Sequence, residues 1–197
     1  MKVMKYPAKE EWGKLVERPH LDVSQLNATV EGVLNDVKNN GDAAVKHYEE
    51  KFDHAHLSAL AVTEAEIEEA EGLISPELKH ALELAHHNIA TFHQSQKFEG
   101  EKVETAPGVT CWQKSVAIEK VGLYIPGGTA PLFSTVLMLA TPAKIAGCKE
   151  IVLCTPPNAE GKVNPAILMA AKIAGVSKIF KAGGVQAIGA MAYGTES

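Results

Sequence analysis

The feature that most constrains the fold is a pattern that recurs from Val121 to Ser197: an apolar strand-like run, a short turn and an apolar helix-like run. The strand-like runs begin 30 and then 27 residues apart, which is the length of a βαβ unit. Because βαβ crossovers are right-handed, this spacing predicts a parallel sheet with helices on its faces. The expected strands are Val121–Ile125, Ile151–Cys154 and Lys178–Lys181, and the expected helices are Leu132–Ala146, Pro165–Ala174 and Val185–Tyr193.

Glycine-rich turns follow the first and third expected strands, Pro126-Gly127-Gly128 and Gly183-Gly184. Open α/β sheets bind ligands at the carboxyl ends of their strands, and free N–H groups at a helix start suit a pyrophosphate or a carboxylate. The first turn could equally be only a tight connection between strand and helix. The fingerprint G-x-G-x-x-G and a P-loop are both absent, and no acidic residue ends the second strand. The pattern alone therefore predicts a nucleotide-like α/β corner.

Two side chains stand where a ligand in that corner would lie. Tyr124 ends the first strand, and Gln186 starts the last helix. An aromatic ring there can stack on another ring, and an amide can form a hydrogen bond with a ribose or an amide group. The alternative, which the pattern favours when taken alone, is a packed tyrosine and a glutamine at a helix start.

The composition changes in the middle of the chain. Residues 1–100 hold 10 Lys/Arg against 18 Asp/Glu and all 8 His, whereas residues 101–197 hold 9 against 6 and all 3 Cys. The first part therefore reads as helical and solvated, and the second as a buried sheet. We expect an arm and helical region over 1–108 and an α/β region over 109–197, with the boundary in the polar stretch 99–108.

Helical spacing and capping signals divide the first part. A helix from Val23 should end at Asn40-Gly41, and Asp42 can cap the next one. Thr63 and Glu66 form a capping box, and Ser75-Pro76 should start a long helix over 77–96. Its expected buried stripe is Leu78, Leu82, Ala85, Ile89 and Phe92. Residues 109–118 are expected to form one or two strands that lead into the sheet.

Two histidine groups could bind a metal. His80, Glu83 and His87 could share a helix face, and His54-Ala55-His56 could chelate from a loop. A solvated helix face and a polar surface turn are the commoner explanations, and no HExxH motif or paired cysteines favour the metal. The three cysteines, Cys111, Cys148 and Cys154, fit reduced, buried residues of a cytoplasmic protein.

Composition argues against two classes of partner. With a net charge of −5 and a pI near 5.9, the sequence has no basic cluster that would favour nucleic acid. No apolar run approaches the ~20 residues of a membrane span, and the first ten residues lack the apolar core of a signal peptide.

Long stretches of this sequence resemble one family. VGLYIPGGTAPLFSTVLMLATPAKIAGCKEIVLCTPP and KAGGVQAIGAMAYGTES are similar to histidinol dehydrogenase of histidine biosynthesis, and so are GVTCWQKSVAIEKVG and NIATFHQSQK upstream. The resemblance covers nearly the whole chain from about Val23. It implies a Rossmann-like fold of the kind seen in aldehyde dehydrogenases, and a homodimer.

The resemblance also implies an activity and a cofactor site. The family oxidises L-histidinol to L-histidine in two NAD-dependent steps, with a zinc that orients the substrate and a Glu-His pair for acid/base work. Its NAD contacts correspond here to Tyr124 and Gln186, and we place Gly127 and Gly128 beside them as candidate cofactor-binding residues.

The family's zinc ligands and its Glu-His pair lie beyond the GTES motif, in which this sequence stops at Ser197. We therefore expect an incomplete Rossmann-like sheet preceded by a helical region, with no catalytic residue and no zinc ligand of its own. We expect this chain by itself to be inactive. The alternatives are a non-catalytic half-length module that needs a partner chain, or an inactive relic.

Overall fold

Three parallel strands form the centre of the molecule, in the order β3-β4-β5. The structure is a computed structural model, and it describes residues 3–18, 24–127 and 130–197. In the register of the sheet, Cys154 of β4 lies between Tyr124 of β3 and Phe180 of β5. The parallel sheet and its strand positions confirm the sequence prediction. The strands are β3 (Lys120–Tyr124), β4 (Glu150–Thr155) and β5 (Lys178–Lys181).

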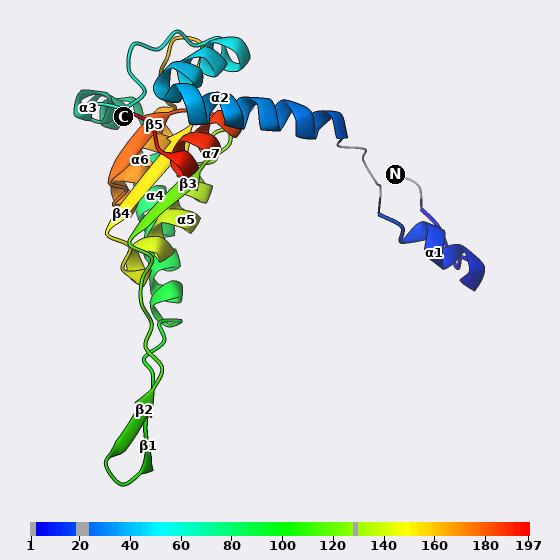
Figure 1. The fold of residues 1–197 in the computed structure, drawn as a ribbon, viewed down its shortest axis with the longest axis vertical. Coiled ribbons are helices and arrows are strands. Elements are labelled where there is room, and N and C mark those ends of the chain that lie inside the picture. The colour runs from blue at the N-terminus through cyan, green and yellow to red at the C-terminus, as the bar shows by residue number, and fades with distance from the viewer. Residues whose placement is uncertain (1–2, 19–23, 128–129) are drawn as a thin grey trace.

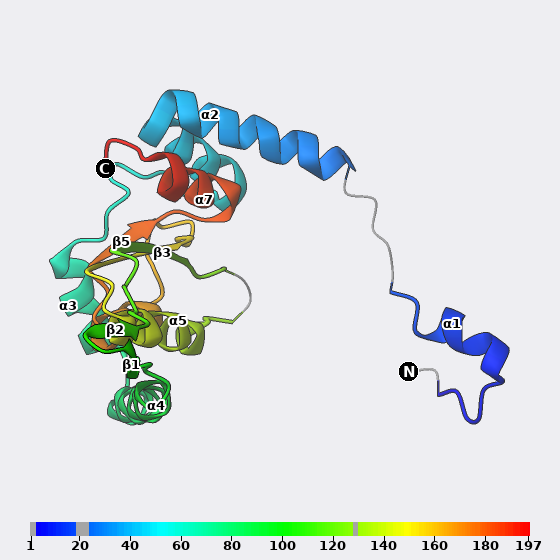
Figure 2. The ribbon, with the colours of Figure 1, turned by 60° about the horizontal axis from the view of Figure 1, so that its bottom comes forward.

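Helices cover both faces of this sheet (Figures 1 and 2). Side chains alternate along β4, so Leu153 packs in one apolar cluster with α4, α5 and α6, and Cys154 packs in the other with α2 and α7. The helix and strand boundaries after residue 120 lie within two residues of those that the sequence predicts. The helices that follow the strands are α5 (Phe133–Ala146), α6 (Pro165–Ala174) and α7 (Gly184–Tyr193).

The N-terminal region is helical, as predicted. The hydroxyl of Thr63 accepts a hydrogen bond from the N–H of Glu66, and the Glu66 carboxylate accepts one from the N–H of Thr63, which is the predicted capping box. Ser75 caps the following helix through the N–H of Leu78. The elements are η1 (Lys9–Glu11), α1 (Trp12–Leu15), α2 (Ser24–Tyr48), the π-helical η2 (Glu49–Asp53), α3 (Glu64–Leu73) and α4 (Pro76–Gln94).

Helix α2 breaks at Gly41, where the sequence predicts one helix to end and another to begin. Gly41 has φ +52° and ψ −133°, a conformation that favours glycine. The end of the described chain packs against this break: Glu196 accepts a hydrogen bond from the N–H of Asp42, and Ser197 donates to the Asp42 carboxylate. A side chain at position 41 would overlap the Glu196 carboxylate, so glycine also makes room for this contact.

A short segment between η2 and α3 pairs with the outer edge of β5. Ala61 forms an antiparallel bridge with Phe180, and the backbone N–H of Lys181 donates to the carbonyl of Leu60 at 2.7 Å. This edge of the sheet is therefore covered by the chain itself.

One apolar cluster contains both Leu82 of α4 and Val136 of α5, so the core is continuous across the predicted boundary at 99–108.

One expectation holds in part and two are wrong. Residues 109–118 contain the predicted strand, β2 (Val109–Trp112), but it pairs antiparallel with the unpredicted β1 (Lys102–Ala106) in a separate hairpin that projects from the molecule (Figure 1), and not with the central sheet. Every residue of both strands is exposed, so no burial pattern marks them. Cys111 on β2 is consequently exposed rather than buried. Phe92 is 62% exposed, because the face of α4 that packs on the core ends at Ile89.

Candidate functional site

A cavity of about 1040 Å³ lies at the carboxyl ends of the three parallel strands. Such ends are where open α/β sheets bind ligands. The turns after all three strands contribute to its wall, and helix α2 and helix α3 close it from the side. Its lining includes Leu26, Phe52, Asp53, Glu66, Glu69, Tyr124, Pro126, Gly127, Thr155, Pro156, Asn158, Lys162, Gly184 and Gln186.

Two glycines let the turns approach one another around a proline. A Cβ on Gly127 would overlap the Cγ of Pro156, and a Cβ on Gly183 would lie 2.7 Å from the Cβ of Pro156. Only glycine fits at both positions without moving the proline ring. The sequence predicts Gly127 and Gly128 as backbone donors to a ligand. Gly127 lies on the cavity wall, whereas Gly128 lies outside the described residues.

Tyr124 lies at the end of β3, half-buried on the cavity wall, as its position in the sequence predicts. Its hydroxyl accepts a hydrogen bond of 3.0 Å from the backbone N–H of Gly184. Gly184 has φ +52°, the left-handed conformation that glycine adopts with least strain. The tyrosine therefore braces the turn after β5 as well as lining the cavity.

Gln186 lines the same cavity, but its side chain forms a hydrogen bond with the buried Glu49. It is 1% exposed, and its amide nitrogen donates a hydrogen bond of 2.8 Å to Oε1 of Glu49. The same carboxylate oxygen accepts a second hydrogen bond of 2.8 Å from the backbone N–H of Gly183. The structure thus brings Tyr124 and Gln186 to the two sides of one turn. Contact of either residue with a cofactor stays a prediction.

Sequence reasoning missed the two acidic residues beneath this turn. Glu49 is fully buried, and burial raises the pKa of its carboxyl even though Gly183 and Gln186 donate to it. Burial also raises the pKa of the Asp53 carboxyl on the cavity wall. Burial raises the pKa of the Cys154 thiol to about 12. The available signal was position: Glu49 follows Val45 by four residues and shares its buried helix face.

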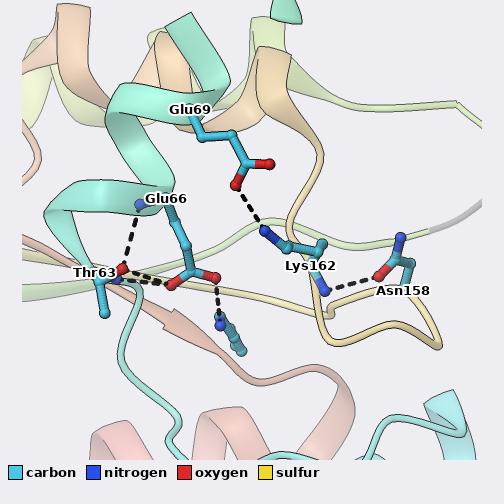
Figure 3. A network of polar contacts seen from close by, with 6 residues as sticks. Thr63, Glu66, Glu69, Asn158 and Lys162 are labelled. Atoms are coloured by element: carbon cyan, nitrogen blue, oxygen red, sulfur yellow. Dashed lines mark hydrogen bonds and ion pairs between the residues drawn. The ribbon is translucent and has the colours of Figure 1, made fainter. Parts of the chain in front are cut away.

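The far wall of the cavity is polar and internally paired (Figure 3). The ammonium group of Lys162 lies 2.7 Å from the Glu69 carboxylate, and the backbone N–H of Lys162 donates to the side chain of Asn158. Glu66 pairs with Lys181 at 2.6 Å. Burial raises the pKa of Glu66, but hydrogen bonds from Lys181 and Thr63 outweigh it and lower the pKa overall. These residues place both signs of charge beside the apolar turns.

The histidine groups do not gather ligands. His80, Glu83 and His87 are all exposed on α4, which fits the solvated face. His56 lies 3.6 Å from Glu50 on an exposed turn. Within residues 3–18, 24–127 and 130–197, no three His, Cys, Asp or Glu side chains come together in a way that could hold a metal ion. In the same ranges, no helix is both long and apolar enough to cross a membrane.

Comparison with protein families identifies the chain. Residues 16–197 match the family model for histidinol dehydrogenase. The chain belongs to the histidinol dehydrogenase family. This confirms the resemblance drawn from the sequence motifs around Tyr124 and Gln186, and it identifies the family as one of oxidoreductases in histidine biosynthesis.

Comparisons with individual proteins of the histidinol dehydrogenase family support the same assignment. A histidinol dehydrogenase of Bacteroides thetaiotaomicron is 68% identical over 197 residues, which are all of this chain and 46% of the relative. One from Shigella dysenteriae is 50% identical over 95% of this chain and 43% of its own length. The crystal structure of histidinol dehydrogenase from Elizabethkingia anophelis superposes with a TM-score of 0.91 at 50% identity, over 96% of this chain and 44% of that one. The chain spans about half the length of these histidinol dehydrogenases.

Proposed function

We propose that this chain forms the N-terminal part of a histidinol dehydrogenase that oxidises L-histidinol to L-histidine in two NAD-dependent steps. Family membership over residues 16–197 supports the reaction class. This chain corresponds to 46% of its Bacteroides relative. We therefore assign the reaction to a polypeptide of that relative's whole length, which we name the natural-length polypeptide, and we assign a share of the cofactor site to this chain.

The observation that carries the proposal is the cavity at the ends of β3, β4 and β5. NAD, when bound, accepts the hydride that leaves the substrate carbon. A dinucleotide needs a strand-end cleft into which backbone can approach closely, and Gly127 and Gly183 leave that room beside Pro156. Tyr124 offers a ring on which a base or a nicotinamide can stack. The cavity volume of about 1040 Å³ lies at the upper end of the usual range for ligand pockets.

Zinc is a separate part of the proposal. The described residues contain no group of three ligands that fits zinc, so we derive no step through the metal from this chain. The resemblance implies that zinc ligands and the Glu-His pair lie C-terminal of Ser197. A homodimer, which the family resemblance implies, and a cytoplasmic location, which unpaired cysteines favour, complete the proposal.

The experiment measures NADH formation from L-histidinol and NAD by the natural-length polypeptide and, in parallel, by the 197-residue chain. We expect turnover from the first and none from the second. Tyr124→Ala in the natural-length polypeptide should raise the Michaelis constant for NAD, since it removes both the ring and the brace on Gly184. Tyr193→Ala is the matched control, because that tyrosine is half exposed on the outer end of α7.

NADH formation by the 197-residue chain alone would contradict the assignment of the catalytic groups to other residues. No turnover by the natural-length polypeptide, with zinc supplied, would contradict the dehydrogenase proposal and favour a non-catalytic module. Co-purification with a second chain that restores turnover would identify that module's partner.

A further inference from the structure

One buried carboxylate organises the turn on which the proposed cofactor site depends. Oε1 of Glu49 accepts two hydrogen bonds of 2.8 Å, one from the backbone N–H of Gly183 and one from the amide nitrogen of Gln186. The next residue, Gly184, donates its N–H to Tyr124. Two adjacent backbone N–H groups are thus fixed by two side chains: Glu49 accepts from Gly183 in the interior, and Tyr124 accepts from Gly184 on the cavity wall.

The two partners each retain an oxygen without a partner. Among the described residues, Oε2 of Glu49 and Oε1 of Gln186 form no hydrogen bond, and both are buried. Two buried acceptors in adjoining side chains are costly, because each loses its hydrogen bonds to water and gains none. A single proton on Oε2 of Glu49 would turn one acceptor into a donor for the other. A carboxylic acid and a primary amide pair in this reciprocal way, with one N–H···O and one O–H···O bond.

We propose that Glu49 is a positioning residue of the cavity and that it works as a neutral carboxylic acid paired with the amide of Gln186. The pairing fixes which end of the amide faces Glu49, and it locks Gly183-Gly184 in place. The effect on cofactor binding rests on the proposed NAD-dependent function, whereas the protonation of Glu49 does not.

The surroundings favour the neutral form. Asp53 on the same π-helical turn adds a like charge, and Cys154 on β4 faces Glu49 with a thiol that burial keeps protonated. Within residues 3–18, 24–127 and 130–197, no lysine, arginine or histidine forms an ion pair with Glu49. Burial without a cation raises the pKa of this carboxyl, which agrees with the geometry.

The first test is spectroscopic and needs no activity. Infrared difference spectra of the natural-length polypeptide, recorded as the pH is raised, should show the carbonyl band of a buried protonated carboxyl at pH values where an ordinary glutamic acid, with a pKa near 4.5, has ionised. The band should be absent from Glu49→Gln and present in Glu50→Gln, which changes the exposed neighbour. Loss of the band at the ordinary pKa, or its persistence in Glu49→Gln, would overturn the proposal.

The second test uses enzyme kinetics. Glu49→Gln keeps an oxygen for Gly183 and Gln186 and places an N–H donor where the acid carries its proton, so NAD binding should stay within about twofold of wild type. Glu49→Ala removes both bonds and should raise the Michaelis constant for NAD about tenfold, with a smaller change in kcat. As the pH rises through the pKa of Glu49, that constant should increase in wild type and stay level in Glu49→Gln.

If Glu49→Gln is impaired as much as Glu49→Ala, the charged carboxylate is the working form and the proposal fails. It also fails if Glu49→Ala binds NAD like wild type. Should Glu49→Ala not fold, the comparison of Glu49→Gln with wild type across pH still decides. A wild-type protein that shows the infrared band but forms no NADH from histidinol would refute the proposed function and leave the protonation of Glu49 standing.

Discussion

The hydroxyl of Tyr124 accepts a hydrogen bond of 3.0 Å from the backbone N–H of Gly184. Tyr124 ends β3, and Gly184 is the first residue of α7, close after β5. Strands β3 and β5 are not neighbours in the sheet, because β4 lies between them. This bond therefore links the end of β3 to the segment that follows β5, and both residues line the cavity.

Tyr124→Phe should separate bracing from stacking. The variant keeps the ring but removes the acceptor for the Gly184 N–H, so we expect a loss of about 1 kcal/mol in the free energy of unfolding. The Michaelis constant for NAD should rise a few-fold. Urea unfolding measures the change in stability, and initial rates at varied NAD concentration measure the change in the Michaelis constant. Equal behaviour of Tyr124→Phe and wild type in both measurements would show that the brace is dispensable.

Gly127→Ala should distort the cavity wall. The new methyl group would overlap the ring of Pro156, which has no flexible end that can move aside, so we expect a destabilisation of about 1–3 kcal/mol. Gly72→Ala is the matched control, because a Cβ there meets nothing within 4 Å on helix α3. That control should be neutral or more stable by up to about 1 kcal/mol. Thermal unfolding of both variants makes the comparison.

Leu82→Ala tests whether the helical region and the sheet share a core. Leu82 of α4 is 2% exposed and packs in the cluster that also holds Val136 and Leu153. Its truncation should cost about 2–5 kcal/mol in one cooperative transition. Leu84→Ala removes a 53% exposed leucine from the same helix and should cost less than about 1 kcal/mol. Two separate unfolding transitions in Leu82→Ala would contradict a shared core.

Stability should depend on pH through Glu71. Hydrogen bonds from Lys172 and Lys79, at 2.8 and 2.6 Å, lower the pKa of this carboxyl to about 2. The folded pKa lies below the unfolded value near 4.5, so this contribution is present above about pH 4.5 and is lost as the pH falls toward 2.

Glu71→Gln should therefore flatten the decline of the urea midpoint between pH 4.5 and 2, and Glu68→Gln, one helical turn away from that network, should leave it unchanged. Because Glu71 lies near the surface, 1 M salt should weaken the effect. A decline in Glu71→Gln as steep as in wild type would assign the pH dependence to other carboxylates.

Much of the fold follows from local patterns. The strand at Lys178–Lys181 and the helix at Pro165–Ala174 have the predicted boundaries, because apolar runs and capping residues act over a few neighbours. Strand β2 lies in the region 109–118 that the sequence predicts as strand, but its pairing with β1 was not predictable in this way, since the side chains of both strands are exposed. Phe92 was misjudged because helical spacing cannot tell where a neighbouring helix stops.

The residues of the candidate site also fall into those that the sequence predicts and those that it does not. Tyr124 and Gln186 follow from their places after a strand and after a glycine turn, and the structure puts both on one cavity. Glu49 did not follow, because its hydrogen-bond partners Gly183 and Gln186 lie more than 130 residues away in the sequence. Its four-residue spacing from the apolar Val45 is shared by many exposed acidic residues of helices, so this signal alone did not identify a buried carboxylate.

The bridge between Ala61 and Phe180 and the packing of α2 on α7 both join segments that lie far apart in the sequence, and this has a consequence for the synthesis of the chain. Ribosomes add residues from the N-terminus at roughly 5–20 per second, so the partner of Ala61 emerges on the order of ten seconds later. During that interval Val37 and Val45 of α2 have no α7 to cover them. The first long helix to be synthesised is thus exposed to chaperones and to other nascent chains until nearly two hundred residues have been translated.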